Sequence, residues 1–403
     1  MEPRDPLFSP DVDAALDALP ADVSELVALD RLRRQFGPEL ARRAVEQRVL
    51  RPRAARKSPS GALHWLTRKG LEQATHESVA RWRAARFVAR APGRVVFDAT
   101  CGLGADALAL ASAGLRVVAG ERDRDVVPYA AANARRAGSS VLVVRADATR
   151  PPLNAPERVA LFDPDRRSDG ERLTDPATWS PSWSSLLAVS AEFAGACIKL
   201  APGFDRVRNA APDDEGPALE RAAWSIVSHR GELVETTLWR GLLAPRAELE
   251  AVVIDARGEA HAFVAEPGRP EALDDDAARA ARFVVEPDVA LLQADLLGTF
   301  AREYGARALH ADSGFRGADA AIESPFARSF RVLGVVSADA KQVRALLREH
   351  DVGPVTVKKR GHPTPADALA KQFAGSGSRH GLVIVARLER GHVAYLVESV
   401  PPR

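Results

Sequence analysis

The sequence predicts an α/β protein whose central domain is a parallel, doubly wound sheet. Three observations support this prediction. Apolar strand patterns alternate with helix patterns from residue 94 onward, a glycine turn follows the first strand, and an acidic residue ends each of four successive strands. Alternating strands and helices are typical of parallel sheets, whose ligands bind at the carboxyl ends of the strands. We therefore expect a ligand site at that edge of the sheet.

The elements of the central domain follow from these patterns. We expect strands at residues 94–98, 115–120, 140–145, 158–162 and 194–200, with helices at 105–113 and 126–136 between the first three. Proline near the start of the second helix is tolerated there, because its missing N–H would have no partner in the first turn. Residues 222–228 and 247–255 are further strand candidates that could complete the sheet.

The N-terminal residues 1–90 are predicted to form a helical region packed beside the sheet. Apolar residues recur at helical spacing over residues 11–50, the basic segment 51–57 interrupts that pattern with a proline, and residues 71–88 indicate one long helix. Between residues 31 and 90, Lys and Arg outnumber Glu sixteen to four. This excess is either an electrostatic footprint for phosphate backbones or a set of ordinary solvated arginine faces.

The C-terminal part has an α+β rhythm of its own. Strands are expected at 330–336, 355–360, 381–388 and 393–399, with helices at 340–350 and 365–373. A polar stretch at 268–282 resembles a domain boundary, and residues 286–303 are expected to be helical, with the helix beginning after Pro287. The predicted segments are therefore a helical region (1–90), the sheet domain (91–282), a helical connector (283–327) and an α+β domain (328–403).

Composition excludes several classes of protein. The 403 residues are 46% hydrophobic and 27% charged, with a net charge of +2, and no apolar stretch approaches the roughly 20 residues of a membrane-spanning helix. The N-terminus lacks an apolar signal core, so we expect a cytoplasmic protein. Two cysteines, Cys101 and Cys197, cannot supply a disulfide framework, and the nine histidines lack metal-ligand spacing. We expect no membrane partner and no protein-bound metal.

The candidate ligand turn runs from Asp98 to Gly104. Asp98 ends the first strand four residues before Gly102, where a carboxylate would repel the pyrophosphate that dinucleotide sites hold at a helix N-terminus. It suits a ligand with a cationic amino-acid end, of which S-adenosylmethionine is the common one. Ala107 stands where a third glycine would complete a dinucleotide fingerprint, so an NAD-linked dehydrogenase is disfavoured.

Three further acids follow later strands. Glu121 is placed to accept two ribose hydroxyls, Asp147 can accept the adenine amino group, and Asp163 ends the fourth strand. Each acid alone could cap the helix or turn that follows it, but four in register favour a shared site. The candidate cofactor-binding residues are Asp98, Thr100, Cys101, Gly102, Gly104, Glu121, Arg122, Asp147, Ala148 and Asp163.

Two motifs resemble known methyltransferases. Asp-Ala-Thr-Cys-Gly-Leu-Gly-Ala-Asp-Ala-Leu at residues 98–108 and Ala-Ala-Asn-Ala at 131–134 are similar to class I S-adenosylmethionine-dependent methyltransferases, among them the RNA cap guanine-N2 (trimethylguanosine synthase-like) branch. Residues 330–400, with Val-Lys-Lys-Arg-Gly at 357–361, resemble the THUMP-like C-terminal domain of a bacterial methyltransferase family. That family also carries a helical segment like Leu-Glu-Gln-Ala-Thr at 71–75. The resemblance implies a Rossmann-like methyltransferase sheet that uses S-adenosyl-L-methionine.

The resemblance places the acceptor chemistry at Asp163 and Pro164. Amino-group methyltransferases of this class carry Asp/Asn/Ser-Pro-Pro-aromatic there, and the acid and the following carbonyl accept hydrogen bonds from the target NH2. This chain has Asp165 and Arg166 where the second proline and the aromatic belong, which leaves the acceptor open. A guanidinium can stack on a base or pair with phosphate, so Arg166 and Arg167 are candidate substrate contacts together with Asp165. The alternative for the arginines is salt bridges with neighbouring aspartates.

Other basic residues are candidate substrate contacts. Lys199 lies at the end of the next strand and could meet an anionic substrate, although a lone lysine is as often solvated. Lys358, Lys359 and Arg360 end a strand of the terminal domain. Such a cluster either contacts phosphates, which position a nucleic acid without reading its sequence, or is a solvated strand end.

The leading hypothesis is a methyltransferase that modifies a base of RNA, of the tRNA or rRNA class. Methyl transfer needs the nucleophile held in line at roughly 3–3.5 Å rather than strong acid–base chemistry, so Asp163 is assigned to orientation and charge stabilisation. One alternative is a methyltransferase acting on a small molecule, protein or DNA. Another is a catalytically inactive adaptor that binds S-adenosylmethionine and RNA.

Overall fold

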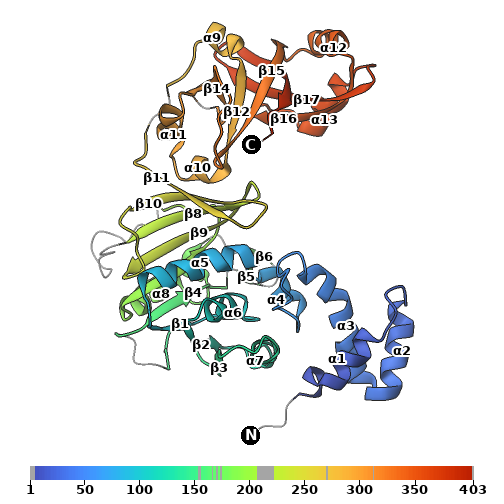
Figure 1. Ribbon diagram of the computed structural model, residues 1–403, viewed down its shortest axis with the longest axis vertical. Helices are drawn as coiled ribbons and strands as arrows, with labels where there is room; N and C mark the ends of the chain where they lie inside the picture. The colour runs from blue at the N-terminus through green and yellow to red at the C-terminus, as the bar shows by residue number, and fades with distance from the viewer. Residues whose placement is uncertain are drawn as a thin grey trace. The chain divides into compact units, whose positions relative to one another are not determined.

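The computed structural model describes residues 5–152, 156–165, 167–168, 171–172, 175–206, 222–268, 271–311 and 313–401 (Figure 1). The chain divides into two units, Met1–Trp224 with Thr236–Glu248, and Ser225–Glu235 with Leu249–Arg403. The four segments predicted from the sequence stay predictions beside this division. Among the described helices, none is both long and apolar enough to cross a bilayer.

The first unit is built on a parallel sheet in the order β7-β4-β1-β2-β3. Its strands are β1 (Val95–Asp98), β2 (Arg116–Glu121), β3 (Leu142–Arg145), β4 (Val159–Phe162) and β7 (Gly195–Leu200), and β9 (Glu232–Gly241) pairs antiparallel with β7. The chain leaves β1 toward β2 and β3, and later returns to the opposite side of β1 with β4 and β7. Ligands of open α/β sheets bind at such a switch point. The predicted doubly wound α/β fold is confirmed.

Helices cover both faces of this sheet, because alternate strand residues point to opposite sides. On β4, Val159 and Leu161 join the core beneath α5 (Glu77–Arg90), α6 (Ala105–Ser112) and α7 (Val127–Arg136). Phe162 joins the core beneath α8 (Trp183–Ala191) on the other face. A residue that ends a strand and lies on the same face of the sheet as Val159 and Leu161 therefore points toward α5 and α6. This applies to the aspartates and lysines at those strand ends.

The N-terminal helices pack on α7. They are η1 (Pro6–Phe8), α1 (Pro10–Asp17), α2 (Glu25–Phe36), α3 (Pro38–Ala54) and α4 (Arg68–Gln73). The Phe8 ring contacts Trp65 and Tyr129 edge-on, with centroids 5.4 and 5.0 Å apart. The fully buried Asn133 amide accepts the backbone N–H groups of His64 and Trp65 and donates to the carbonyls of Trp65 and Leu103. The predicted helical region thus packs beside the sheet.

Two expectations for this region were wrong. The predicted break at 51–57 does not begin at Arg51, because α3 continues to Ala54 with Pro52 in its last turn. There the Arg51 guanidinium lies 5.0 Å from the Trp65 ring centroid and 2.7 Å from the Asp13 carboxylate, which holds that turn in place. The predicted single helix over 71–88 is two helices, α4 and α5, separated at residues 74–76.

Polar side chains cause the separation of α4 from α5. Lys57 Nζ lies within 3.0 Å of the carbonyls of Leu71, Glu72 and Ala74, which satisfies the end of α4. The Thr75 hydroxyl then donates to Asp106 at 2.7 Å instead of continuing a helical face. The apolar spacing across 71–88 does not report these tertiary hydrogen bonds.

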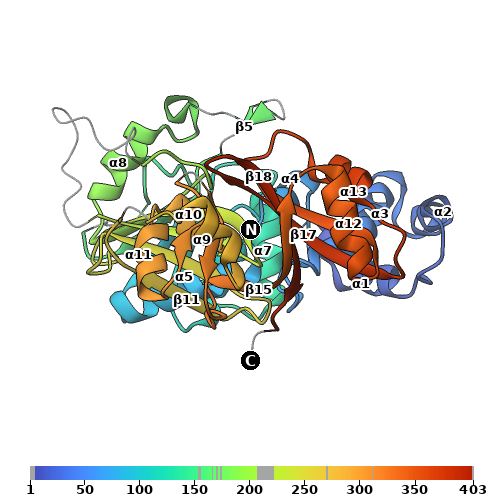
Figure 2. The same ribbon diagram turned by 90° about the horizontal axis from the view of Figure 1, so that it is seen from above.

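The second unit holds a seven-stranded sheet in the order β13-β14-β12-β15-β18-β17-β16. Its strands are β12 (Phe283–Pro287), β13 (Arg307–Ala308), β14 (Arg316–Ala318), β15 (Ala327–Ser337), β16 (Val352–Arg360), β17 (Arg379–Leu388) and β18 (Gly391–Ser399). Helices α12 (Ala340–Glu349) and α13 (Ala366–Phe373) lie side by side on one face, over Val383 and Leu396 (Figure 2). Helix α9 (Asp275–Ala280) contributes to the core on the opposite face.

The remaining strands of this unit are β8 (Ala223–His229), β10 (Leu249–Ile254) and β11 (Ala260–Val264), which extend the first sheet's order as β11-β10-β8-β9. Their apolar residues pack on α10 (Val289–Gln293) and α11 (Leu297–Glu303). The helical stretch expected after Pro287 is present as two helices, α10 and α11, separated at residues 294–296, and Pro287 itself ends strand β12. Val284 and Val285 are fully buried between β14 and β15, a setting that favours β-branched side chains.

Candidate functional site

A cavity of about 430 Å³ lies in the first unit where β1, β2, β3 and β4 end. Loops after these strands form one side, and residues of α4 and its flanks form another. Most of the predicted cofactor residues line it, namely Asp98, Thr100, Cys101, Gly102, Glu121, Arg122, Asp147, Ala148 and Asp163. Gly104 stands just behind, as the N-cap of α6.

The glycine turn needs backbone conformations that other residues rarely adopt. Gly102 has φ of 53° and Gly104 has φ of 94°. A Cβ at Gly102 would meet no atom within 4 Å, so the turn is open on that side. Cys101 between strand and turn is buried, and burial raises the pKa of its thiol well above the usual value. The thiol is therefore a packing group rather than a nucleophile.

Asp98 is a buried carboxylate with an unused oxygen. It is 1% exposed, its Oδ1 accepts the Thr100 N–H at 3.4 Å, and its Oδ2 has no hydrogen-bond partner among the residues that the structure describes. Burial, and next the charge of Asp106, raise the pKa of Asp98 to about 8. A buried polar atom without a partner is costly, so Oδ2 is suited to a hydrogen-bond donor or a cation supplied by a ligand.

Glu121 and Asp147 face the same cavity and also hold its loops. Glu121 Oε2 accepts the Gly102 N–H at 3.0 Å, and Oε1 accepts the Asp123 N–H at 2.8 Å. Asp147 Oδ1 accepts both the N–H and the hydroxyl of Thr149, and these bonds lower the pKa of Asp147. Each carboxylate oxygen has more than one lone pair, so the loop contacts leave capacity for ligand hydroxyl or amino groups.

The wall of the cavity is acidic. Its carboxylates belong to Glu72, Asp98, Asp106, Glu121, Asp123, Asp147, Asp163 and Asp165, and its cationic side chains to Lys69 and Arg122. A cleft lined by one sign of charge raises the local concentration of the opposite sign. The cavity therefore favours a positively charged ligand.

The predicted acceptor residues lie at the mouth of β4. The Asp163 N–H donates to the Thr100 hydroxyl at 2.6 Å, which ties this loop to the glycine turn. Asp163 Oδ2 accepts from Lys199 Nζ at 2.5 Å. Pro164 and Asp165 line the cavity beside it. The structure thus brings the predicted acceptor loop and the predicted cofactor turn to one cavity.

Asp165 is held by the N-terminal helix α4. Its Oδ2 accepts from Lys69 Nζ at 2.8 Å and its Oδ1 from Gln73 Nε2 at 3.1 Å, while its backbone pairs with Ser180. These contacts account for an aspartate where related motifs have proline. Arg166 lies outside the described residues. Arg167 is described by its backbone alone, in the short strand β5 (Arg167–Ser168) paired with β6 (Glu171–Arg172).

Lys199 belongs to a buried polar cluster that the sequence analysis missed. Only 6% exposed, it donates to Thr75 at 2.6 Å and to Asp106 Oδ2 at 3.1 Å as well as to Asp163. The fully buried Arg83 pairs with Asp106 Oδ1. Although burial alone raises the pKa of Asp106, Arg83 and then Lys199 outweigh it and lower that pKa to about 2. The available signal was a charged residue within the Ala- and Leu-rich helix that follows the glycine turn.

The predicted phosphate contacts of the C-terminal domain lie in the second unit. Lys358 Nζ pairs with Glu286 at 2.6 Å, and Lys359 Nζ donates to the His362 carbonyl at 2.6 Å. Arg360 donates to the Gly314 carbonyl, and its guanidinium lies 5.2 Å from the Phe315 ring centroid. Their role toward RNA stays a prediction.

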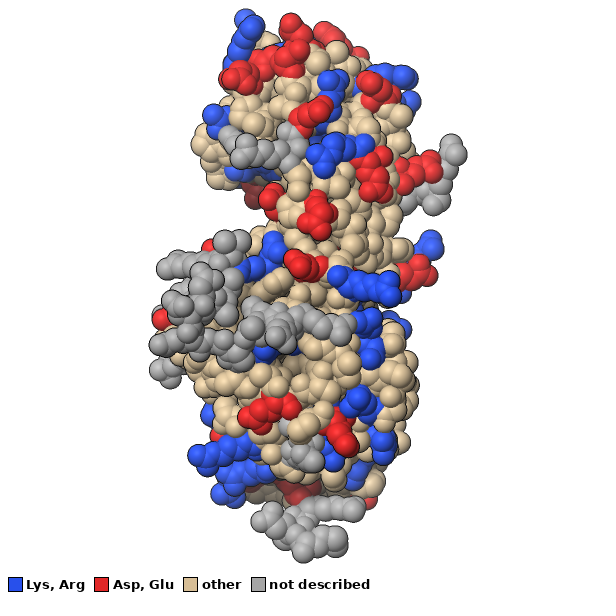
Figure 3. Space-filling view, turned by 90° about the vertical axis from the view of Figure 1, so that its left-hand side faces the viewer, with Lys and Arg blue, Asp and Glu red and all other residues tan. Residues whose placement is uncertain are grey.

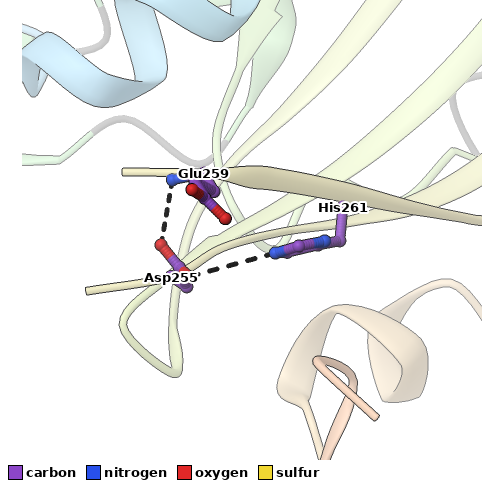
Figure 4. Close-up of side chains that lie close together, drawn as sticks. All are labelled: Asp255, Glu259 and His261. Atoms are coloured by element: carbon purple, nitrogen blue, oxygen red, sulfur yellow. Dashed lines mark hydrogen bonds and ion pairs between the residues drawn. The ribbon is translucent and has the colours of Figure 1, made fainter. Parts of the chain in front are cut away.

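One group of potential metal ligands occurs among the described residues, at the β10–β11 hairpin (Figure 4). Ligand atoms of Asp255, Glu259 and His261 lie within 4.8 Å of one another. Asp255 Oδ1 accepts the N–H groups of Arg257 and Glu259, and His261 Nε2 is 3.9 Å from Asp255 Oδ2. An Asx-type turn of this kind explains the arrangement, and none of the three residues is among those that line the cavity.

Over most of its length, the chain is similar to proteins described as S-adenosylmethionine-dependent methyltransferases. Residues 327–399 match the family model described as THUMP domain-like. Two relatives from Mycobacterium tuberculosis, strains CDC 1551 / Oshkosh and ATCC 25618 / H37Rv, are each described as an uncharacterized S-adenosylmethionine-dependent methyltransferase. Each is 30% identical over 378 residues, covering 92% of this chain and 99% of the relative. A solved structure described as a methyltransferase from Porphyromonas gingivalis W83 shares the fold, with TM-score 0.70, 20% identity, and coverage of 97% of this chain and 98% of that one.

Proposed function

The chain belongs to the S-adenosylmethionine-dependent methyltransferases, and we propose that it methylates a base of RNA, of the tRNA or rRNA class. It is an enzyme that uses S-adenosyl-L-methionine and carries a THUMP-like domain. The observation that carries the RNA proposal is the presence, on one chain, of the acidic cavity and of a domain resembling THUMP modules. A cavity for a methyl donor alone would serve any acceptor, whereas a THUMP-like domain is expected where the acceptor is RNA.

The residues of the cavity fit S-adenosylmethionine, which supplies a methyl group on a positively charged sulfur. We assign the unpaired Asp98 Oδ2 to the ammonium of its amino-acid end, because that buried oxygen lacks a donor. Glu121 would accept the ribose hydroxyls and Asp147 the adenine amino group, with the lone pairs that their loop contacts leave. The acidic wall complements the sulfonium charge.

We assign acceptor orientation to Asp163 and to the carbonyl of Pro164. Both line the cavity next to the glycine turn, and both offer acceptors to the N–H groups of an amine. Such orientation aligns the nitrogen lone pair with the methyl group, and most of the rate of an in-line transfer comes from alignment. Asp165 is assigned to docking of α4 rather than to the substrate, since Lys69 and Gln73 take up its carboxylate.

The distribution of charge on the surface by itself neither identifies nor excludes a path along which a nucleic acid binds. On the face drawn in Figure 3, Lys and Arg side chains are interspersed with Asp and Glu side chains rather than gathered in one large patch. The RNA proposal therefore depends on particular residues, and it calls for a direct assay of the acceptor.

The test is transfer of labelled methyl groups from S-adenosylmethionine into total RNA, protein, DNA and small molecules from a strain that lacks the gene. We expect label in RNA with the wild-type chain. Asp163→Ala is expected to lower the initial rate about 100-fold while the affinity for S-adenosylmethionine, measured by calorimetry, stays within about threefold. Asp11→Ala, an exposed aspartate of α1, is the matched control with unchanged rate.

The outcomes separate the candidate functions. Label confined to protein, DNA or small molecules would overturn the RNA proposal and favour another acceptor. S-adenosylmethionine binding without label in any pool, together with RNA binding, would identify an inactive adaptor. Binding that Asp98→Ala and Glu121→Ala leave intact would overturn the assignment of the cavity.

A further inference from the structure

We propose that Lys199 is a positioning residue for methyl transfer, which holds one oxygen of the Asp163 carboxylate so that the other is presented to the acceptor amine. The inference rests on the proposed function in one respect, that Asp163 contacts the acceptor. It replaces the expectation that Lys199 itself meets an anionic substrate.

The hydrogen bonds of Lys199 account for its whole ammonium group. An ammonium has three N–H donors, and Nζ has three oxygen neighbours at 2.6, 3.1 and 2.5 Å, from Thr75, Asp106 and Asp163. Its side chain is 7% exposed and is not among the residues that line the cavity. An anionic substrate would have to displace a carboxylate from a buried cation to reach it. Lys199 therefore acts through Asp163.

The two oxygens of Asp163 have different surroundings. Oδ2 takes the Lys199 hydrogen bond, and among the described residues no group donates to Oδ1. The side chain is 29% exposed at the cavity, whereas Lys199 is buried behind it. The backbone of Asp163 is fixed separately by the Thr100 hydroxyl. With main chain and one oxygen both held, the remaining oxygen has a defined direction for a hydrogen bond.

Charge balance explains why a lysine can be buried here. Arg83 and Lys199 supply two positive charges, and Asp106 and Asp163 supply two negative charges. Asp98 adds no full charge near neutral pH in the absence of ligand, because burial raises its pKa to about 8. Buried charges persist when they are paired and hydrogen-bonded. Removal of Lys199 would leave Asp163 without its cation and Asp106 with Arg83 alone.

The experiment measures methyl transfer by Lys199→Met, which keeps an unbranched side chain one atom shorter and removes its charge and donors. Initial rates are determined against concentration of whichever cellular pool the wild type labels. We expect kcat to fall about 100-fold, because the acceptor is misaligned, while KM for the pool and the affinity for S-adenosylmethionine change by less than about threefold. Lys199→Arg, which keeps a cation and several donors, is expected to regain part of the lost rate.

Arg83→Met is the matched control for loss of stability. It removes the other cation that pairs with Asp106 and leaves the Lys199–Asp163 bond in place. We expect both methionine variants to unfold at lower temperature, since each breaks a buried ion pair. Only Lys199→Met should lower kcat strongly. If Lys199→Met does not fold, kcat of Lys199→Arg is compared with kcat of Arg83→Met. The positioning role then requires the lower kcat for Lys199→Arg.

The outcomes separate this inference from the proposed function. Label in a pool other than RNA overturns the RNA proposal, and the Lys199 variants are then judged on that pool. A Lys199 variant that folds and keeps kcat within about threefold of wild type overturns the positioning role. So does an Arg83→Met variant that loses as much kcat as Lys199→Met, or a wild-type chain that labels no pool.

Discussion

At the scale of single residues, Asp98 is a buried carboxylate whose environment, among the described residues, lacks a compensating cation of its own. A carboxylate that is 1% exposed, with one oxygen unpartnered, opposes folding once it is ionised. The nearest compensation, Lys199, already pairs with Asp106 and Asp163. A positively charged group of a bound ligand would give the unpartnered oxygen of Asp98 the partner that the protein does not provide. The residue thus reduces stability in the free enzyme and is suited to binding.

The pH dependence of stability tests this view of Asp98. Its folded pKa of about 8 lies above the unfolded value of 3.8, so the folded chain binds the extra proton between these values. Stability is therefore lost as pH rises from about 4 to about 8. Asp98→Asn lacks this loss. Without S-adenosylmethionine, we expect its melting temperature, relative to wild type, to rise by roughly 5 °C between pH 5 and pH 8.

Asp147→Asn is the control for that measurement. The Thr149 hydrogen bonds lower the pKa of Asp147 below its usual value of 3.8, so its contribution is fully present above pH 5. Its difference from wild type should stay constant over the same range. A constant difference for Asp98→Asn as well would contradict a buried, proton-binding carboxylate.

At the scale of elements, the short helix α4 connects the N-terminal region with the acceptor loop. Lys69 and Gln73 lie one helical turn apart, so both reach the Asp165 carboxylate from one face. Gly70 permits the close approach of this helix to the glycine turn, because a Cβ there would lie 2.7 Å from Leu103. Because α4 ends before α5 begins, the Thr75 side chain is free of a helical face and bonds to Asp106 and Lys199 in the buried cluster.

Loss of the Asp165 contacts should loosen α4. We expect Asp165→Asn to increase amide hydrogen exchange in residues 68–73 severalfold, because the ion pair with Lys69 is lost. The effect on global stability should be small, since Lys69 is 67% exposed and exposed ion pairs contribute little. Hydrogen-exchange mass spectrometry of full-length protein measures this.

Arg68→Met provides the comparison on the same helix. Arg68 pairs with Glu46 of α3 and makes no contact with the acceptor loop among the described residues. Exchange in 68–73 should stay close to wild type in this variant. Equal acceleration by both substitutions would mean that Asp165 has no particular part in holding α4.

At the scale of the whole molecule, the acidic cavity and the THUMP-like domain belong to different units of the chain. If RNA is the acceptor, contacts in the second unit contribute affinity rather than chemistry. The three predicted phosphate contacts there are unequal. Glu286 neutralises Lys358 and also lies near Arg360, whereas Lys359 donates to a carbonyl, which carries no charge.

Salt dependence of RNA binding tests that inequality. We expect Lys359→Gln to weaken binding of total tRNA or rRNA and to reduce the slope of log affinity against log salt by about 0.7, the value for one single-strand phosphate contact. Affinity for S-adenosylmethionine should not change. Lys358→Gln is the neighbouring control, with a smaller change in slope. A slope that Lys359→Gln leaves unaltered would remove this residue from the phosphate contacts.

The alternation of strands and helices, the glycine turn and the acids at strand ends were readable from the sequence because each depends on residues close together in the chain. A strand followed by Gly102 and Gly104 fixes where Asp98 must lie, and the parallel fold then brings Glu121, Asp147 and Asp163 to the same edge. The C-terminal α+β pattern was readable for the same reason.

Only the tertiary structure decided which charges are buried together. Lys199 meets Thr75 and Asp106 across 124 and 93 residues, and Lys69 meets Asp165 across 96. Local patterns assign such residues to solvent, because a charge is expected to remain hydrated unless a partner is known. The glycine turn with Asp98 was therefore determined by the sequence itself. The support of the acceptor loop was determined by long-range packing, which replaces water around those charges with one another.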